Sequence, residues 1–477
     1  MMRQPVHPLD IQTLEARFGK KYKWMVISIV AIGIVAAILL STSFNVAIPV
    51  LMRHFSVNQN EVQFVVTAFI VANTIAMLPS PWLVERFGLR RCFVVAMTVL
   101  AISTVLGALS QNFIVLIVAR VIQGAVSGVL FPLGTIVAMT QFPPNEQGRA
   151  SGFMGFGMIL VPAVAPAIGG TMIDTFGWQA VFLMSLPFCA VAIIGATAYL
   201  ARPSFGKLHN FDWSGMALLS LMTLAILGCA ISLKDIFKAP LFPTISALVT
   251  FASLAFFLTH ARRQHAIVTR EVLQWRPVSL GSIVSFAYGF GLYGSSYQIP
   301  VFLQTVRGLS ASESGGILLP AGLALAATLP LAGMLADRIQ PHKIVVSGLA
   351  LYGMSSALLW QSADTISYSA LISITILGRV GIGLLMSALN KAAMNGLEGR
   401  AVRQAAMVIN YIRMLGGFLG VALLVVFVDW RSANLGATRA SVVQAYCESF
   451  LLSALVYGIA MAAAWRMKPS LTDTKHK

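Results

Sequence analysis

Three arginines of this chain lie inside long runs of apolar residues: Arg120, Arg379 and Arg413. A guanidinium buried among apolar side chains is costly unless a carboxylate, backbone carbonyls or an anionic ligand pair with it. Gln123 lies one turn after Arg120 and shares its helix face. We interpret Arg120 as functional, with locking of neighbouring helices as the alternative. For Arg379 we weigh a functional role and the locking of neighbouring helices equally.

Acidic residues are rare in the same runs. Glu448 lies about two turns into the last run, and it is our candidate for a group that gains and loses a proton. A carboxylate that reaches the water interface is the alternative for Glu448. Asp174 and Asp429 lie at the ends of runs, where solvated loop positions are favoured.

Polar and aromatic side chains gather in residues 278–304, where Tyr288, Tyr293 and Gln298 interrupt an apolar pattern. Tyrosine offers an apolar body with one hydrogen-bonding group, which suits amphipathic ligands. We expect these side chains to bind substrate together with Asn410 and Arg413. An aromatic belt at the membrane interface is the alternative for the outermost tyrosines.

These residues sit in a chain that is 57% hydrophobic and only 10% charged, whereas soluble domains carry about 25% charged residues. A spanning helix needs about 20 apolar residues, and the stretches here are too long and too continuous for barrel strands. The sequence therefore predicts an all-α polytopic membrane protein with fourteen spans. The expected spans are 24–50, 61–82, 92–110, 113–140, 149–172, 178–200, 212–233, 241–260, 278–304, 313–336, 343–361, 367–395, 402–428 and 441–465.

The formal charge of +17 does not indicate a nucleic-acid partner, because the basic residues gather in the loops on one side of the predicted membrane. The loops on the other side hold only Arg53, Lys234, Lys238, Arg307, Arg431 and Arg439. Because Lys and Arg concentrate in cytoplasmic loops, we expect both termini in the cytoplasm and the protein in a plasma membrane, here a bacterial inner membrane.

The chain repeats itself at an offset of roughly 250 residues. Residues 81–86 resemble 333–338, the Gly-Arg-Ala at 148–150 recurs at 399–401, and Arg120 is echoed by Arg379. Repeats of this spacing indicate two parallel halves related by an axis along the membrane normal. The expected parts are a tail (1–23), a six-helix bundle (24–200), a linker with two extra spans (201–276), a second six-helix bundle (277–465) and a tail (466–477).

The order of several short motifs resembles the major facilitator superfamily, and in particular its fourteen-helix drug:proton antiporters. The family's G-x-L-x-D-R-x-G-R-R loop is matched by Pro81, Leu83, Glu85, Arg86, Gly88, Arg90 and Arg91. Its R-x-x-Q-G motif is matched by Arg120, Gln123 and Gly124, and its N-V-A-L-P motif begins at Asn45. Its glycine- and proline-rich helix is matched by Gly152, Gly157, Pro162, Pro166, Gly169 and Gly170, and residues 178–187 resemble the entry to its sixth helix.

The resemblance implies a major facilitator fold and export of amphipathic or lipophilic small molecules by alternating access. It assigns proton coupling to Arg120, substrate contacts to Asn45 and Gln123, and close helix packing to Gly157, Pro162, Pro166, Gly169 and Gly170. Three departures matter: Pro81 replaces the first glycine of the loop motif, Ser185 stands where asparagine is usual and, most important, Leu40 stands where the family usually carries an acidic residue. Proton-coupled antiport is the first hypothesis, and an uncoupled facilitator, or an exporter of anionic or neutral amphiphiles, is the second. A non-transporting membrane sensor is the third.

The same resemblance predicts a gate on the cytoplasmic side. Glu85 should meet the start of the span at 402–428 near Arg400 or Arg403, and Asp337 should meet the start of the span at 149–172 near Arg149. The remaining gate candidates are Arg86, Gly88, Arg90, Arg91 and Arg338.

No ATP-binding glycine loop and no metal-binding spacing of the four cysteines is visible, so we expect no enzyme, cofactor or metal. The proton gradient is the expected energy source. The expected partners are the lipid bilayer and a small-molecule substrate, and a periplasmic adaptor protein is a further candidate.

The charge distribution gives the first testable prediction. A cysteine introduced at Lys207 should resist a membrane-impermeant thiol reagent in intact cells and react after permeabilisation, because residues 201–211 are expected in the cytoplasm. A cysteine at Lys238, expected outside, is the matched control and should react in both conditions. Reaction at position 207 in intact cells would overturn the predicted orientation.

Overall fold

The computed structural model describes residue 14 and residues 17–42, 44–57, 59–201, 210–232, 241–263, 266–309, 311–362, 367–436 and 438–467, which are almost entirely helical. The first half contains η1 (Gly19–Lys21), α2 (Tyr22–Thr42), α3 (Phe44–Phe55), α4 (Gln59–Ala76), α5 (Ser80–Ala108), α6 (Phe113–Thr140), α7 (Gln147–Phe176), α8 (Ala180–Leu183) and α9 (Leu186–Tyr199). The linker contains α10 (Trp213–Ser232), α11 (Leu241–His260) and α12 (Arg270–Gln274). The second half contains α13 (Arg276–Thr305), α14 (Ala311–Arg338), α15 (Pro341–Ser362), α16 (Tyr368–Ala393), α17 (Gly399–Asn434) and α18 (Arg439–Trp465).

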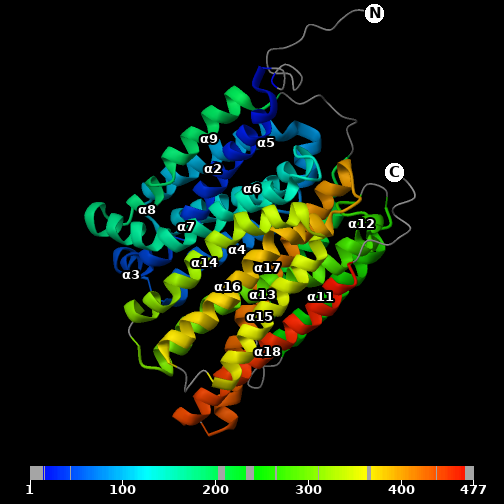
Figure 1. The fold of residues 1–477 in the computed structure, drawn as a ribbon. Helices are drawn as coiled ribbons and strands as arrows, with labels where there is room; N and C mark the ends of the chain where they lie inside the picture. The colour runs from blue at the N-terminus through cyan, green and yellow to red at the C-terminus, as the bar shows by residue number, and fades with distance from the viewer. Residues whose placement is uncertain are drawn as a thin grey trace, which may run out of the picture.

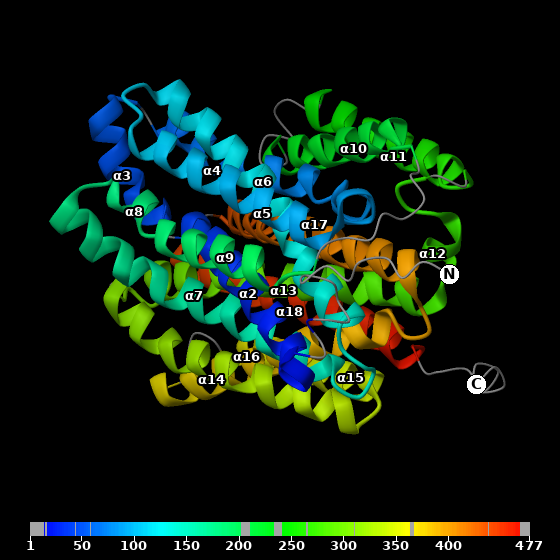
Figure 2. The ribbon, with the colours of Figure 1, turned by 90° about the horizontal axis from the view of Figure 1, so that it is seen from above.

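The helices run roughly side by side in two bundles, α2–α9 and α13–α18 (Figure 1). Helix α2 begins and α18 ends at the same end of the molecule, which we call the terminal end (Figure 1). This is the end predicted to face the cytoplasm. Seen from above, α10 and α11 lie together at one edge (Figure 2).

Helices cover most of each of the fourteen predicted spans, although 24–50, 61–82 and 178–200 are each divided between two helices. Among the described residues, eleven helices are long and apolar enough to cross a membrane by length and composition. The three remaining spans are covered by α4, whose apolar part is the shorter stretch Phe64–Ala76, and by α7 and α13. Large apolar side chains such as Ile102, Ile194 and Phe251 are more than 60% exposed on the helices, as expected for surfaces that face lipid.

The stretch around Gly88 differs from the prediction. We predicted a loop joining spans 61–82 and 92–110, but α4 already ends at Ala76 and α5 starts at Ser80. Pro81, whose missing N–H costs nothing in a first helical turn, starts this helix. Gly88 interrupts it with φ 76° and ψ 158°, a conformation almost confined to glycine. The loop motif is therefore a short helix that turns sharply at Gly88 into the span.

A buried carboxylate joins the linker helices at the terminal end. Asp212 precedes α10, and its Oδ1 lies 2.7 Å from Nε2 of His260 at the end of α11. Its oxygens also accept hydrogen bonds from the backbone N–H groups of Gly215 and Ile267, both at 2.9 Å. Burial disfavours the charged carboxylate, but these hydrogen bonds and His260 outweigh it and lower the pKa of Asp212. Asp212 therefore stays ionised and ties the start of α10 to the end of α11.

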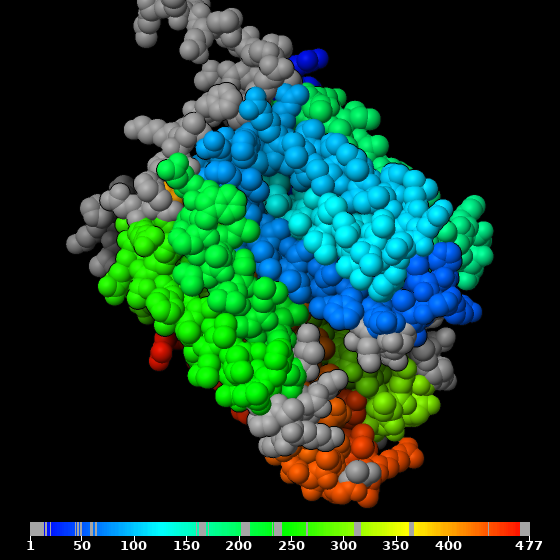
Figure 3. All heavy atoms as spheres, turned by 180° about the vertical axis from the view of Figure 1, so that it is seen from behind, coloured from blue at the N-terminus to red at the C-terminus, as the bar shows by residue number. Residues whose placement is uncertain are grey.

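The linker helices also attach to the second bundle. The hydroxyl groups of Thr223 on α10 and Tyr411 on α17 lie 2.6 Å apart. In the view from behind, α10 and α11 form a separate face of the molecule beside the first bundle (Figure 3). The two extra helices are thus peripheral, and the two bundles meet each other directly.

Candidate functional site

At the terminal end, the carboxylate of Asp337 on α14 meets the first turn of α7. Its oxygens accept hydrogen bonds from the backbone N–H groups of Gly148 at 2.9 Å and Arg149 at 3.0 Å. Nζ of Lys391 on α16 lies 2.8 Å from Oδ1 of Asp337. Free N–H groups and the helix dipole stabilise a carboxylate in this position. The predicted contact near Arg149 is confirmed, although the backbone makes it and Arg149 is exposed.

The pseudo-symmetric contact is also present. The carboxylate of Glu85 on α5 lies 3.6 Å from Nε of Arg400 and 3.7 Å from Nη2 of Arg403, both on α17. This confirms the predicted pairing of Glu85. The side chains are 21–30% exposed, so the ion pairs contribute little to stability by themselves. They do join the first bundle to the second.

Two other gate candidates make contacts within the first half of the chain. The guanidinium of Arg86 lies 5.4 Å from the ring centre of Trp82, and Nη2 of Arg90 donates to the carbonyl oxygen of Thr197 at 2.6 Å. Arg338 is exposed at the end of α14. The gating roles of these residues, and of Arg91, stay predictions.

Glycines let α7 and α14 approach each other next to Asp337. A Cβ on Gly333 would overlap the carbonyl oxygen of Gly148, and a Cβ on Gly152 would lie 2.6 Å from the carbonyl oxygen of Leu329. No side chain can be accommodated there without separating the two backbones. The two bundles are therefore packed backbone to backbone at the terminal end.

The predicted packing residues lie further along α7. A Cβ on Gly157 would meet only Cγ2 of Val35, at an ordinary 3.5 Å. Pro162, Pro166 and Gly170 lie in α7, but their side-chain surroundings fall outside the described part of the structure. The packing roles of these four residues and of Gly169 stay predictions.

Arg120 on α6 is only 1% exposed and is held by backbone carbonyls. Its Nε donates to the carbonyl oxygen of Val65 at 3.3 Å, and its Nη1 donates to the carbonyl oxygen of Leu40 and to Oε1 of Gln123, both at 3.1 Å. At position 40, where the resemblance led us to expect an acidic residue, the group that meets Arg120 is thus the main-chain carbonyl of Leu40. Among the described residues Arg120 forms no ion pair.

Two aromatic rings complete the surroundings of Arg120. Its Cζ lies 4.3 Å from the ring centres of both Phe44 and Phe69. A guanidinium stacks favourably on aromatic faces, and a desolvated contact of this kind contributes about 2 kcal/mol. Arg120 is therefore enclosed within the first bundle, where it joins α6 to α2, α3 and α4.

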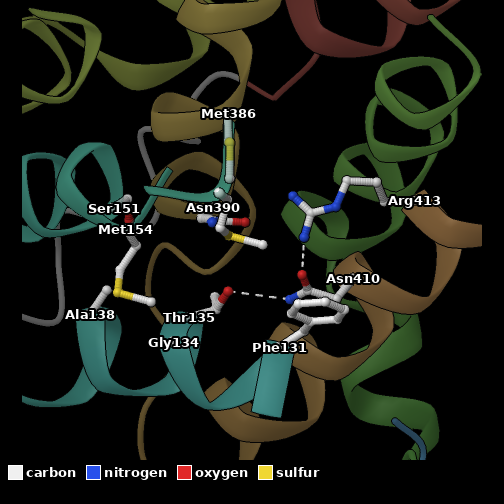
Figure 4. A pocket seen from close by; sticks show the side chains of 11 residues that line it. Phe131, Gly134, Thr135, Ala138, Ser151, Met154, Met386, Asn390, Asn410 and Arg413 are labelled. Atoms are coloured by element: carbon white, nitrogen blue, oxygen red, sulfur yellow. Dashed lines mark hydrogen bonds between the residues drawn. The ribbon is translucent and has the colours of Figure 1, made fainter. Parts of the chain in front are cut away.

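A small cavity lies between the two bundles, beyond the Asp337 contact. Asn410 on α17 links its two walls, because its Nδ2 donates to Oγ1 of Thr135 on α6 at 3.2 Å (Figure 4). Arg413, 7% exposed, donates through Nη2 to Oδ1 of Asn410. The lining residues are Phe131, Gly134, Thr135, Ala138, Ser151, Met154, Met158, Met386, Asn390, Asn410 and Arg413.

Only two of the predicted substrate residues, Asn410 and Arg413, line this cavity. Tyr288 is fully buried with its ring centre 5.5 Å from the guanidinium of Arg413, and Tyr293 is 41% exposed. Gln298 instead joins α13 to α18, since its Nε2 donates to Oγ of Ser449 at 2.5 Å.

The remaining two predicted substrate residues lie elsewhere. Gln123 lies inside the first bundle, where its Nε2 donates to the carbonyl oxygen of Ser103 at 3.3 Å. Asn45 lies in α3, and its side chain falls outside the described part.

Glu448 lies on α18 towards the end opposite the terminal end. Its carboxylate accepts two hydrogen bonds from Arg431, from Nε at 2.6 Å and from Nη2 at 2.9 Å. Gln444 donates a third bond at 3.0 Å, and the Glu448 side chain is 25% exposed. This bidentate pair favours the ionised carboxylate. A proton could bind Glu448 only in competition with Arg431.

Sequence reasoning missed Lys391, Ser151 and Asn390. Lys391 has no basic counterpart near residues 139–140, the matching place in the first half, so the internal repeat gave no hint of it. Ser151 and Asn390 are buried polar residues in apolar helices, and that property was the signal that could have found them.

Comparison with known proteins identifies the chain. The family model for the Major Facilitator Superfamily matches residues 30–421. This chain belongs to the Major Facilitator Superfamily. It is 27% identical to the uncharacterized MFS-type transporter YcnB of Bacillus subtilis over 87% of this chain and 88% of the relative.

Two further relatives have more informative names. A multidrug resistance protein B homolog of Mycobacterium tuberculosis is 28% identical over 82% of this chain and 73% of the relative. The riboflavin transporter RibZ of Clostridioides difficile is 26% identical over 84% and 87%. The crystal structure of the human organic anion transporter MFSD10 superimposes with a TM-score of 0.66 at 16% identity, covering 91% of this chain and 99% of that one, and shows the likeness of the fold alone.

The glycine contact at the terminal end can be tested with Gly333→Ala. The added methyl group would overlap the backbone of α7, and such overpacking costs about 1–3 kcal/mol. We expect a slower transport cycle and faster labelling of a cysteine placed at Ser151 by a reagent supplied at the terminal end. Gly322→Ala on the same helix is the control, because a Cβ there meets nothing within 4 Å. Equal behaviour of the two variants would contradict a closing role for this contact.

Arg120→Met separates a functional arginine from a structural one. Methionine fills a similar length but loses the hydrogen bonds and the stacking of Arg120, so we expect a lower melting temperature in a protein that still folds. Transport should be lost, and Arg120→Lys should restore little of it because an ammonium group lacks the planar fork. If transport by Arg120→Met matches wild type per folded molecule, Arg120 only joins helices.

Proposed function

We propose that this protein exports amphipathic small molecules across a bacterial inner membrane by alternating access, in exchange for protons. The observation that carries the proposal is the cavity between the two bundles, directly beyond a contact that closes one end. A transporter of this class needs such a cavity and an end that can close and open over it. The gate contacts also speak against a non-transporting sensor.

The direction of transport and the ligand class are supported by the relatives and by the cavity lining. One relative carries the name of a multidrug resistance protein, although another is a riboflavin transporter. Met154, Met158 and Met386 line the cavity, and methionine side chains adapt to ligands of different shapes. These features favour a lipophilic ligand of moderate selectivity. A periplasmic adaptor stays a candidate partner.

An uncoupled facilitator is the second candidate function. It is favoured by the surroundings of Arg120, where Leu40 offers a carbonyl oxygen instead of a carboxylate that could carry a proton. If protons do couple, Glu448 is our candidate, and Arg431 would have to release it when it is protonated. Glu448 would then pair with Arg431 in one access state and carry a proton in the other. This alternation would give Glu448 a different proton affinity in the two states, as coupling requires.

The experiment uses proteoliposomes with an imposed pH gradient and a lipophilic dye. One pH unit corresponds to about 1.4 kcal/mol per proton, so antiport of one proton should accumulate the dye about tenfold. Glu448→Gln should abolish the gradient dependence and keep dye binding. Asp429→Asn, at the same end of the neighbouring helix, is the control and should behave as wild type. Wild-type movement that ignores the gradient in both directions would replace antiport by the facilitator.

A further inference from the structure

The two buried arginines Arg120 and Arg413 differ in how many of their N–H groups have hydrogen-bond partners. Arg120 has three hydrogen bonds and two stacked rings and lines no cavity among the described pockets. Arg413 lines the cavity between the bundles, and its one side-chain hydrogen bond in the described structure goes to Oδ1 of Asn410. A guanidinium has five N–H groups, so most of the hydrogen-bonding capacity of Arg413 is unused.

No acidic residue compensates the charge of Arg413. In the part of the chain that the structure describes, Arg413 forms no ion pair, and no Asp or Glu lines the cavity. The ring of Tyr288, 5.5 Å away, provides only weak compensation. A buried charge without a counter-charge is unfavourable, and an anion that enters the cavity would remove this cost.

A second polar group is also unsatisfied. Ser151 on α7 is 4% exposed, and its hydroxyl group lines the cavity without a hydrogen-bond partner in the described structure. Buried hydroxyl groups normally have a partner. Figure 4 shows Ser151 and Arg413 on different walls of the same cavity. Both can donate to a ligand oxygen, and one comes from each bundle.

The rest of the lining is apolar and adaptable, with Phe131 and three methionines. In this conformation the cavity has room for about one water molecule, so a larger ligand requires the bundles to move apart. A molecule bound between them would place an apolar body against these side chains and one charged group at Arg413. A lipophilic cation would meet the positive charge of Arg413 with no carboxylate on the cavity wall to offset it.

From these contacts we infer that the ligand is an amphipathic monoanion whose carboxylate or sulfonate group binds Arg413, with Ser151 as a further donor. This inference rests on the proposed transport function and names its substrate class. An oxyanion can bind the unused N–H groups of Arg413 while Nη2 still donates to Oδ1 of Asn410, whose Nδ2 joins Thr135 of the other bundle. The bound anion is thus connected, through Arg413 and Asn410, to a hydrogen bond between the two bundles.

Two fluorescent probes that differ in one charged group test the inference on purified protein in uncharged lipid nanodiscs. Anilinonaphthalene sulfonate is the anion, and phenylnaphthylamine is the same ring system without the sulfonate. Losing a hydrogen-bonded charge partner weakens binding by about ten- to a hundredfold. We expect this loss for the sulfonate probe in Arg413→Met, a smaller loss in Ser151→Ala and partial recovery in Arg413→Lys. Phenylnaphthylamine binding should change less than about twofold in all three, which also shows that the cavity is intact.

Arg466→Met is the matched control, because it removes the same charge from an exposed position at the end of α18, and it should change neither probe. Three results would overturn the inference: no sulfonate binding by wild type, unchanged sulfonate binding in Arg413→Met, or an equal loss of both probes. Transport is measured separately in proteoliposomes. Movement of phenylnaphthylamine or tetraphenylphosphonium without Arg413-dependent sulfonate binding would sink the anion assignment and keep the transporter. Arg413-dependent sulfonate binding without movement of any probe would keep the anion assignment and contradict the transport function.

Discussion

The carboxylate of Asp337 at the start of α7 is the interaction on which the arrangement of the two bundles depends. In a protein whose helices present mainly apolar side chains to lipid, the hydrophobic effect does not drive one bundle onto the other, so close packing and a few polar contacts must do it. Asp337 bonds the free N–H groups of Gly148 and Arg149, and Gly333 allows the backbones to meet. Because these bonds go to a helix terminus, separating the bundles exposes both the carboxylate and the N–H groups at once. If this contact opens during transport, as we propose, its hydrogen bonds and its backbone packing are lost together.

The linker is connected to the same region. Gln404, one residue after Arg403, accepts a hydrogen bond from the hydroxyl of Thr269 at 3.1 Å and donates to the carbonyl oxygen of Ala266 at 3.3 Å. The ring of Trp82, three residues before Glu85, lies 4.8 Å from that of Phe211. The segments that flank α10 and α11 thus touch residues next to both sides of the Glu85 ion pairs. Although the extra helices are peripheral, a movement of α17 at this end must be accommodated by the linker.

The sequence predicted the helices and the contacts at the terminal end, because both follow from local signals. Long apolar runs determine spans, and the repeated acidic residues at 85 and 337 placed Glu85 and Asp337 opposite the starts of α17 and α7. The direction of a polar side chain inside a bundle was not predictable in the same way. Gln298 faces Ser449 and Gln123 donates to the carbonyl oxygen of Ser103, because the rotation of a nearly uniformly apolar helix is set by its neighbours and not by its own pattern. The helix before Gly88 was missed for another reason, since charged residues around a glycine are typical of a loop.

Arg120 and Arg413 show why residue type alone does not identify a binding site. Both were predicted from the cost of a charge in an apolar helix, and neither has a carboxylate partner among the described residues. The two arginines differ in the groups that contact them. Carbonyl groups of Val65 and Leu40 turn towards Arg120, whereas Arg413 meets Asn410, whose amide is shared with the opposite bundle. Arg120, bonded to main-chain carbonyls of its own bundle, supports the packing of that bundle. Arg413 has unused N–H groups and contacts Asn410, which links the bundles, so a ligand that binds Arg413 would be coupled to the contact between the bundles.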